Sequence, residues 1–371
     1  METAFSLVMR FILVARACNL AYLACVVGGE PCAKCRATKG RKGTVFCIER
    51  TDSMRQHPFR FGVIAEHVRT REELAHTVRR AEDLGFATFL IRDHFIAEPF
   101  GDQLAPVAAL MYAASTTTRL RVGSLVFDND YRHPIVLAKE AATLDLLSGG
   151  RFEVGIGCGW LKAEYDQAGM PFDEAKVRVD RLEESIRVLK GLFADGPLTF
   201  SGRHYALSEL DGFPKPPQRP HPPILMGAGS KRMLQIAGRE ADAVGILAKA
   251  LPGGTISDDV AERLPEAVER KVQWIREAAG SRFDQIELSM VISVVLTDDR
   301  RSQAERLARA RGWDDVPAER ILSMPSLFIG SLDQVVAEMH FRRERYGFSY
   351  FVVSDADMEA LAPVVAAVAG R

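Results

Sequence analysis

Three short segments carry residue types that could do chemistry. Asp93-His94 places a carboxylate beside an imidazole directly after an apolar stretch, and such a pair can donate or accept a proton near neutral pH. Residues 227–230 (GAGS) precede a helical pattern, where free amides, a hydroxyl and small side chains could hold a phosphate. Residues 155–159 alternate glycine, which leaves room for a flat ligand or a neighbouring backbone. Each segment also has a structural interpretation: a buried polar pair, an N-capping serine, or glycines selected by crowded packing.

The elements that must position these segments are strands, because each segment follows a β-rich apolar stretch. Residues 119–160 show this most fully, with a strand at 120–126, a helix from Pro134 to Gly149-Gly150, and a strand at 152–156. The predicted strands are 61–65, 87–91, 120–126, 152–156, 224–226, 243–247, 286–296 and 350–353. The predicted helices are 71–84, 106–114, one from 134, 177–193, 230–237, 266–279 and 332–346.

This alternation of eight strands with helices predicts an α/β fold, a (β/α)8 TIM barrel with insertions. A doubly wound sheet is the alternative. It would carry a G-x-G-x-x-G loop after the first strand, and residues 65–69 (AEHVR) do not match that pattern. In a barrel the active site lies at the C-terminal ends of the strands, which gathers the three segments at one end.

Composition limits the class of protein. The chain has 371 residues, 47% hydrophobic and 26% charged, as in an ordinary globular enzyme. A formal net charge of −1 gives no electrostatic reason to expect a nucleic acid or a membrane as partner. Cysteine is concentrated before residue 50, and Cys158 is the one that follows, so the main part is built without disulfides. We therefore expect a cytoplasmic enzyme.

Residues 1–53 differ in composition from the rest of the chain. Their apolar run is interrupted by Arg10 and Arg16, which disfavours a membrane span, and no positive charge precedes it as in a signal peptide. Cys32-x-x-Cys35 has zinc-ligand spacing but lacks a matching second pair. We expect residues 1–53 to be an extension, disordered or due to an upstream start, with Met54 the true start and residues 54–371 the barrel domain.

Taken together, several segments resemble the bacterial luciferase-like superfamily of flavin and deazaflavin oxidoreductases. The unit with the RHP and LSGGR landmarks is the most specific, and the other segments fall in the right order between about Phe59 and Asp355. The matching segments are IRDHF, RVGSLVFDNDYRHPIVLAKEAATLDLLSGGRFEVGIGCGW, PPILMGAGS and IGSLDQVVAEMHFRRERYGFSYFVVSD.

The resemblance implies a tricyclic cofactor at the strand ends, under an insertion. It implies that the Ser124-Leu125 junction backs the ring system, often through a non-proline cis peptide, and that residues 227–230 take the cofactor phosphate. Asp93 and His94 would be catalytic, lying near the reactive ring. The implied cofactor-binding residues are Ser124, Leu125, Val126, Gly157, Cys158, Gly159, Tyr165, Gly227, Ala228, Gly229 and Ser230.

Two cofactors fit the resemblance. Coenzyme F420, a deazaflavin, would support hydride transfer to or from a small organic substrate, whereas FMN would support a monooxygenase that needs a separate reductase. The Asp93-His94 pair favours F420. A flavin-binding protein without turnover is a third interpretation, and the lack of an H-x-H pair disfavours a catalytic metal.

The substrate is not readable, because the insertions at 95–105, 160–175 and 196–222 that would line its pocket have little pattern. The acidic loop at 127–130 departs from the apolar run usual in the family, which points to a polar or cationic substrate. The resemblance also implies a homodimer formed through barrel helices.

Overall fold

The computed structural model describes residues 36–39, 45–48 and 57–371, and it consists of two units, Met1–Arg55 and Gln56–Arg371. In the first unit, β1 (Arg36–Lys39) and β2 (Val45–Ile48) form an antiparallel pair. The Cys32 and Cys35 pair and the expected start at Met54 lie outside the described residues. The prediction that residues 1–53 are an extension therefore stays a prediction.

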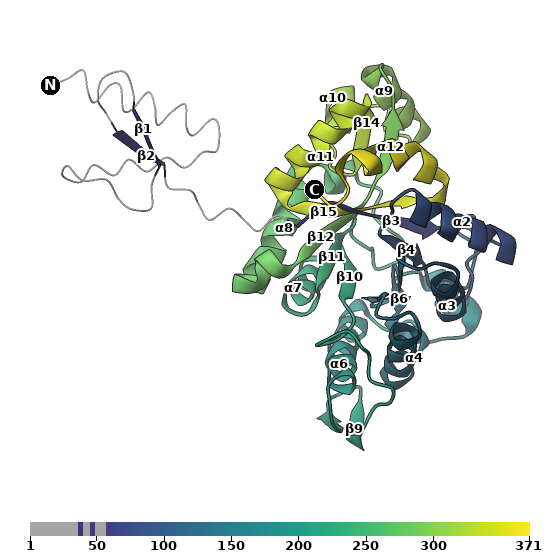
Figure 1. Ribbon diagram of the computed structural model, residues 1–371. Helices are drawn as coiled ribbons and strands as arrows, with labels where there is room; N and C mark the ends of the chain where they lie inside the picture. Colours follow the sequence, from purple (N-terminus) through teal and green to yellow (C-terminus); the bar gives the residue numbers. More distant parts are fainter. Residues whose placement is uncertain (1–35, 40–44, 49–56) are drawn as a thin grey trace. The chain divides into compact units, whose positions relative to one another are not determined.

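The second unit is a closed barrel of eight parallel strands with helices around it (Figure 1). Neighbouring strands follow one another in chain order, and the pairing of β10 with β7 closes the barrel. The fold class predicted from the sequence is confirmed, and each of the eight barrel strands overlaps one of the eight predicted strands. They are β3 (Arg60–Ala65), β4 (Thr88–Ile91), β5 (Arg121–Ser124) with β6 (Phe127–Asp128), β7 (Phe152–Gly157), β10 (Ile224–Ala228), β11 (Ala243–Ile246), β12 (Glu287–Val291) and β15 (Phe348–Ser354).

Some of the barrel helices begin at capping side chains that the sequence supplies. At the start of α2 (Arg71–Asp83), Thr70 Oγ1 accepts a hydrogen bond from the Glu73 amide at 3.1 Å, and the Glu73 carboxylate accepts one from the Thr70 amide at 3.0 Å. The other helices that cover the barrel are α3 (Pro106–Thr116), α4 (Pro134–Leu147), α6 (Ala175–Phe193), α7 (Lys231–Glu240), α8 (Pro265–Ala279), α11 (Leu332–Tyr346) and α12 (Met358–Val368).

One predicted strand was wrong. The apolar stretch 286–296 is two strands, because the backbone changes partner at Ile292: β12 pairs with β15 in the barrel, and β13 (Ser293–Leu296) pairs with β14 (Leu327–Gly330) outside it. Both halves are β-rich, so the sequence pattern is continuous across the change of partner.

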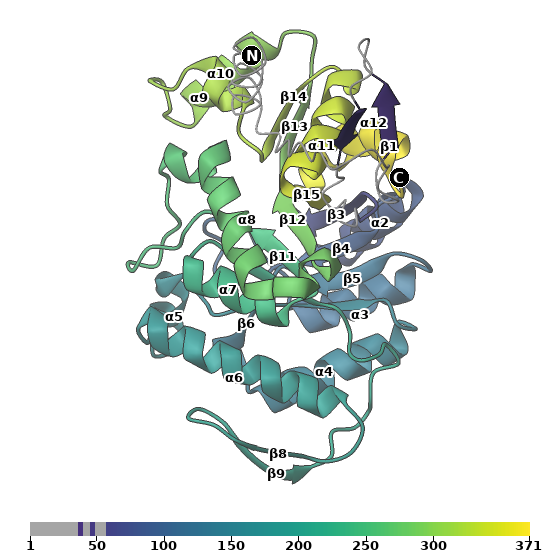
Figure 2. The same ribbon diagram turned by 90° about the vertical axis from the view of Figure 1, so that its left-hand side faces the viewer.

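The insertions contain elements that no periodicity indicated. In the proline-rich stretch 196–223, β8 (Leu198–Ser201) and β9 (Ala206–Leu210) form a hairpin, which Figure 2 shows beside α6. Glu184 of α6 accepts hydrogen bonds from three backbone amides at the turn of that hairpin. The other α-helices of the described chain that were not predicted are α5 (Lys162–Ala168), α9 (Arg300–Ala310) and α10 (Ala318–Leu322), together with α12 after the last barrel strand.

The barrel interior is ionic at its N-terminal end. Glu153 accepts hydrogen bonds from Arg60 Nη1 at 2.6 Å and from Arg121 Nε at 2.5 Å, and Arg60 also pairs with Glu287 at 2.7 Å. An apolar cluster fills the middle of the barrel, so a ligand site can form only at the C-terminal ends of the strands. The cluster consists of Ile64, Leu90, Leu225, Ala243, Tyr350 and Val352.

None of the helices in the described ranges has the length and the apolar content needed to cross a bilayer.

Candidate active site

Glycine occupies the uppermost interior layer on three neighbouring strands, β7, β10 and β11. Leu225 and Ala243 face the interior and are paired in register, so Gly227 and Gly245, two residues further along, face the same side. Gly157 holds the equivalent place on β7, which also pairs with β10. The result is a surface of bare backbone that a flat ligand can approach closely. The apolar side chains that lie on the interior cluster beside it are Leu125, Val126 and Val291.

Strand three breaks between β5 and β6, and the Leu125–Val126 peptide at the break is cis. The resemblance implied a non-proline cis peptide at the Ser124-Leu125 junction, and the structure has one at the next bond, Leu125–Val126. A Cβ on Gly155 would lie 1.7 Å from Ser124 O, and one on Gly157 would lie 2.8 Å from Val126 Cγ2. At Gly155, therefore, glycine is required by the neighbouring backbone. The Ser124 hydroxyl is buried and has no hydrogen-bond partner within the described chain.

The loop after β10 leads into the start of α7. Ser230 is the N-cap residue, but in the part of the chain described here its hydroxyl makes no capping hydrogen bond to the helix. The hydroxyl and the first helix amides therefore remain available to an anion. A Cβ on Gly229 would lie 2.3 Å from Ala248 O, so the loop after β11 leaves space only for glycine there.

The two cations next to this loop point away from it. Arg232 forms an ion pair with Asp180 of α6, and Lys231 Nζ lies 5.8 Å from the ring centroid of Trp274 on α8. Ion pairing and aromatic packing on the outer helices hold these long side chains, so neither cation is directed at the loop.

His94 is held by a buried carboxylate from α5. Its Nδ1 lies 2.8 Å from Glu164 Oε2, which also accepts a hydrogen bond from Tyr131 OH at 2.7 Å. Glu164 Oε1 accepts hydrogen bonds from the backbone amides of Phe95 and Ile96. Burial raises the pKa of Glu164, but the hydrogen bonds from His94 and Tyr131 outweigh it, so the pKa is lowered and the carboxylate stays ionised.

Aromatic side chains flank His94. Its ring centroid lies 5.3 Å from that of Phe100 and 6.0 Å from that of Trp160. The Arg92 guanidinium lies 4.0 Å from the ring centroid of Phe100 and forms an ion pair with Glu66 at the end of β3. His94 Nε2 makes no hydrogen bond to any described residue, and 12% of the side chain is exposed. The ring can therefore exchange a proton at Nε2.

Asp93 has a different environment from its neighbour. Its two oxygens accept hydrogen bonds from Arg132 at 2.6 and 3.1 Å, and Oδ2 also accepts one from the Asp128 amide at 3.1 Å. The carboxylate thus anchors the loop after strand three, and it does not contact the imidazole in the way that Glu164 does.

The acidic loop at 127–130 is engaged internally. Asp128 Oδ2 accepts a hydrogen bond from Tyr165 OH at 2.9 Å, and Asp130 pairs with Arg181 of α6 at 2.8 Å. Burial raises the pKa of Asp128 to about 7. Buried carboxylates take partners from the protein, and these do so. The polar or cationic substrate expected from the acidic loop stays a prediction. Tyr165, which is fully buried, supports the loop.

Cys158 and Gly159 follow β7. Burial raises the pKa of the Cys158 thiol to about 12, so it is protonated at neutral pH and is not an activated nucleophile. Gly159 has a φ of +72°, and a Cβ there would lie 1.9 Å from Tyr165 OH, so glycine is required for Tyr165 to pack.

The sequence placed the strand-end residues but missed the side chains that hold them. Glu164 is 70 positions from His94, and Arg132 is 39 positions from Asp93. No local periodicity links such pairs. A carboxylate in a patternless insertion is an ordinary surface feature until the fold buries it.

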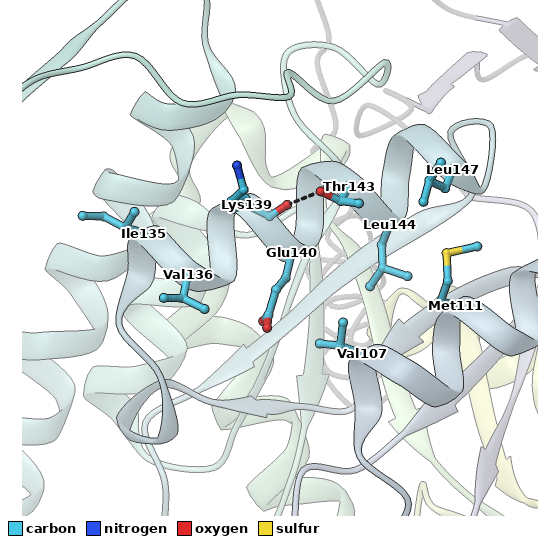
Figure 3. Close-up of a pocket in the computed structure, with 9 residues that line it drawn as sticks. All are labelled: Val107, Met111, Ile135, Val136, Lys139, Glu140, Thr143, Leu144 and Leu147. Carbon is cyan, nitrogen blue, oxygen red and sulfur yellow. Dashed lines mark hydrogen bonds between the residues drawn. The ribbon is translucent and has the colours of Figure 1, made fainter.

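An apolar groove of about 400 Å³ lies elsewhere, on the outside of the barrel between α3 and α4 (Figure 3). It is lined by Val107, Met111, Ile135, Val136, Lys139, Glu140, Thr143, Leu144 and Leu147. Because α3 and α4 cover the outer face of the strands, this groove is separate from the strand-end site.

Comparison with known proteins agrees with this geometry. The family model described as luciferase-like monooxygenase matches residues 45–364. The chain is 34% identical over 163 residues to "FMNH(2)-dependent dimethylsulfone monooxygenase" from Pseudomonas putida, covering 44% of this chain and 45% of that protein. It is 31% identical over 244 residues to "F420-dependent glucose-6-phosphate dehydrogenase" from Kineococcus radiotolerans, covering 65% and 68%.

The chain thus spans less than half the length of the first relative and about two thirds of the second. Among solved structures, "F420-dependent secondary alcohol dehydrogenase in complex with an F420-acetone adduct" matches with a TM-score of 0.66 at 19% identity, covering 84% of this chain and 98% of that one. This likeness shows the shared fold.

Proposed function

Since the chain belongs to the luciferase-like monooxygenase family, we propose that it is an oxidoreductase that transfers a hydride between coenzyme F420 and a small organic substrate. A bound deazaflavin supplies the chemistry of hydride transfer without activating oxygen. The name of the Kineococcus relative supports this cofactor.

The residues at the strand ends fit such a cofactor. The glycine layer of β7, β10 and β11 leaves space for a flat ring system beside Leu125 and Val126. Ser124 offers a buried hydroxyl without a protein partner in the described chain. Residues 227–230, with the free hydroxyl of Ser230 at the start of α7, would hold the phosphate.

His94 would carry the proton that accompanies hydride transfer, at Nε2. The observation that carries this proposal is that Glu164 occupies Nδ1 while Nε2 is left without a partner in the described chain. Asp93 would act by holding Arg132 and the loop after strand three, since its carboxylate is already engaged.

The test is equilibrium binding of the full chain to purified F420, FMN and riboflavin, followed by spectra with candidate substrates. We expect submicromolar F420 binding and much weaker binding of FMN. Tight FMN binding with F420 ignored would contradict the proposal and would favour the second candidate.

That second candidate is an FMN-dependent monooxygenase. It is favoured by the 34% identity to the Pseudomonas monooxygenase. Such an enzyme would need a separate reductase to supply reduced FMN, and oxygen consumption in the presence of that reductase would identify it.

We also propose a homodimer formed through the groove between α3 and α4. Its rim carries exposed apolar side chains, with Val136 49% and Leu147 61% exposed, of the kind that a second copy covers. Lys139 and Glu140 give it one cation and one anion, which a twofold-related copy can pair. Leu147→Glu is expected to give a monomer in sedimentation velocity. The control is Phe341→Glu, at an exposed position on α11, which is expected to remain dimeric. A monomeric wild type would contradict the proposed dimer.

The proposed location is the cytoplasm. The scarcity of cysteine after residue 50, where Cys158 is the one example, supports a reducing compartment.

A further inference from the structure

We propose that Glu164 is a positioning residue that fixes the tautomer of His94, keeping the proton on Nδ1 and leaving Nε2 as the atom that accepts a proton. This inference rests on the proposed role of His94. Glu164 was not among the candidate residues from the sequence, and its place in the site comes entirely from the structure.

Both oxygens of the Glu164 carboxylate accept hydrogen bonds. Oε2 accepts from Tyr131 OH at 2.7 Å and lies 2.8 Å from His94 Nδ1, while Oε1 accepts from the amides of Phe95 and Ile96. The side chain is fully buried. Four donors saturate the lone pairs of an ionised carboxylate, so the group is charged without being exposed to water.

An ionised carboxylate can only accept hydrogen bonds, so the ring nitrogen that faces it must carry a proton. In the neutral ring the other nitrogen, Nε2, then has its lone pair free. Glu164 therefore sets the direction in which the ring works.

The other groups around the ring do not compete for this role. Phe100 and Trp160 flank it and offer no acceptor that would claim Nε2. Tyr131 is the remaining titratable side chain that contacts Glu164, and burial raises its pKa, so it stays protonated and donates. Asp93 and Asp128 act on Tyr131 only at longer range, and hydrogen bonds from Arg132 and Tyr165 hold them.

Glu164→Gln is the sharpest test, because it preserves shape. The amide oxygen can keep the two backbone amides of Phe95 and Ile96, but the NH2 group then faces His94 and donates to Nδ1. The ring is expected to switch tautomer, with the proton on Nε2. Nitrogen-15 spectra of the cofactor-free full chain report this directly, since protonated and unprotonated ring nitrogens resonate apart, and His94→Gln identifies the signal among the eight histidines.

The expected result is protonated Nδ1 in the wild type and protonated Nε2 in Glu164→Gln. Tyr131→Phe is the matched control, because it removes one donor to Glu164 without touching the ring, and it should keep the wild-type tautomer. A wild type with its proton on Nε2 would overturn the inference even if Glu164→Gln failed to fold. An unchanged tautomer in Glu164→Gln would overturn it as well.

Kinetics form the second arm. Glu164→Gln is expected to lower kcat of hydride transfer by about 10²–10⁴-fold, by analogy with a triad whose orienting carboxylate is replaced by an amide, while F420 affinity changes less than about threefold. In the His94→Ala background the same substitution should cost almost nothing more. A further loss of tenfold or more there would show that Glu164 acts by another route. Because the tautomer is read without cofactor, failure of the F420 proposal remains distinguishable from failure of this one.

Discussion

Replacing Asp128 by Asn should stabilise the protein more at pH 8 than at pH 5. Burial raises the pKa of Asp128 to about 7 in the folded protein, against 3.8 for an ordinary aspartate. Because the folded-state pKa is the higher one, the folded protein binds this proton more tightly. The stability it gives is fully present below about pH 4 and is lost as the pH rises through about 7.

The magnitude follows from these two pKa values. Between pH 5 and pH 8 such a carboxyl lowers the free energy of unfolding by roughly 3 kcal/mol, at about 1.4 kcal/mol for each unit of pKa. Asn has no charge to bury and can keep the local geometry. Its oxygen can accept from the Asp130 amide, which now lies 2.9 Å from Asp128 Oδ1, and its NH2 can donate to Tyr165 OH, which can still donate to Asp130.

The assay is urea unfolding of the wild type and Asp128→Asn at pH 5, 6, 7 and 8. The difference in the free energy of unfolding between the two proteins reports the contribution of Asp128, because the other titrating groups contribute equally to both. Asp166→Asn is the control, because Asp166 is 55% exposed and pairs with Lys162 on the surface. The difference in unfolding free energy between this variant and the wild type should not change with pH. If the Asp128→Asn difference varied by less than about 0.5 kcal/mol over this range, Asp128 would titrate as an ordinary carboxyl and the reasoning would fail.

Three further predictions concern the site and the barrel. His94→Ala is expected to slow hydride transfer by about 10²–10⁴-fold with F420 affinity nearly intact, and a wild-type rate would make the histidine structural. Ser230→Ala is expected to weaken FMN or F420 binding by about tenfold, because a hydrogen bond to a charged phosphate is lost, while riboflavin, which has no phosphate, should bind both proteins equally in fluorescence titrations. Glu153→Ala is expected to cost about 3–5 kcal/mol in thermal unfolding by leaving Arg60 and Arg121 without their shared carboxylate. Glu359→Ala, at an exposed ion pair with Arg80, should cost far less stability, and equal losses would contradict the role of burial.

Much of the barrel could be predicted because its signals are local. Strand three, its helix and strand four are marked by Pro134 at a helix start and by Gly149-Gly150 at its end, and the structure places all three elements there. The stretch 286–296 could not be divided, because a strand that leaves the barrel and one that stays have the same apolar pattern.

For the candidate site, the sequence could predict which residues lie at strand ends. Residues at strand ends are found from the strands, so the sequence located His94, Gly157 and Gly227. It also raised both interpretations of the glycines, a neighbouring backbone and a ligand. The structure assigns Gly155 to the backbone of Ser124, whereas Gly227 and Gly245 face the barrel interior, where a Cβ on Gly227 would lie 3.2 Å from Leu247 Cδ1.

The sequence by itself determined the eight repeats, the family resemblance and the end of the barrel where chemistry occurs, because periodicity, caps and motifs act over a few residues. Only the tertiary structure decided which of two adjacent residues, Asp93 or His94, keeps a free polar atom. That choice depends on Arg132, in the loop after strand three, and on Glu164 of α5. Burial then makes each partner obligatory, since a charged group removed from water must be paired, and burial is a property of the folded chain rather than of any local segment.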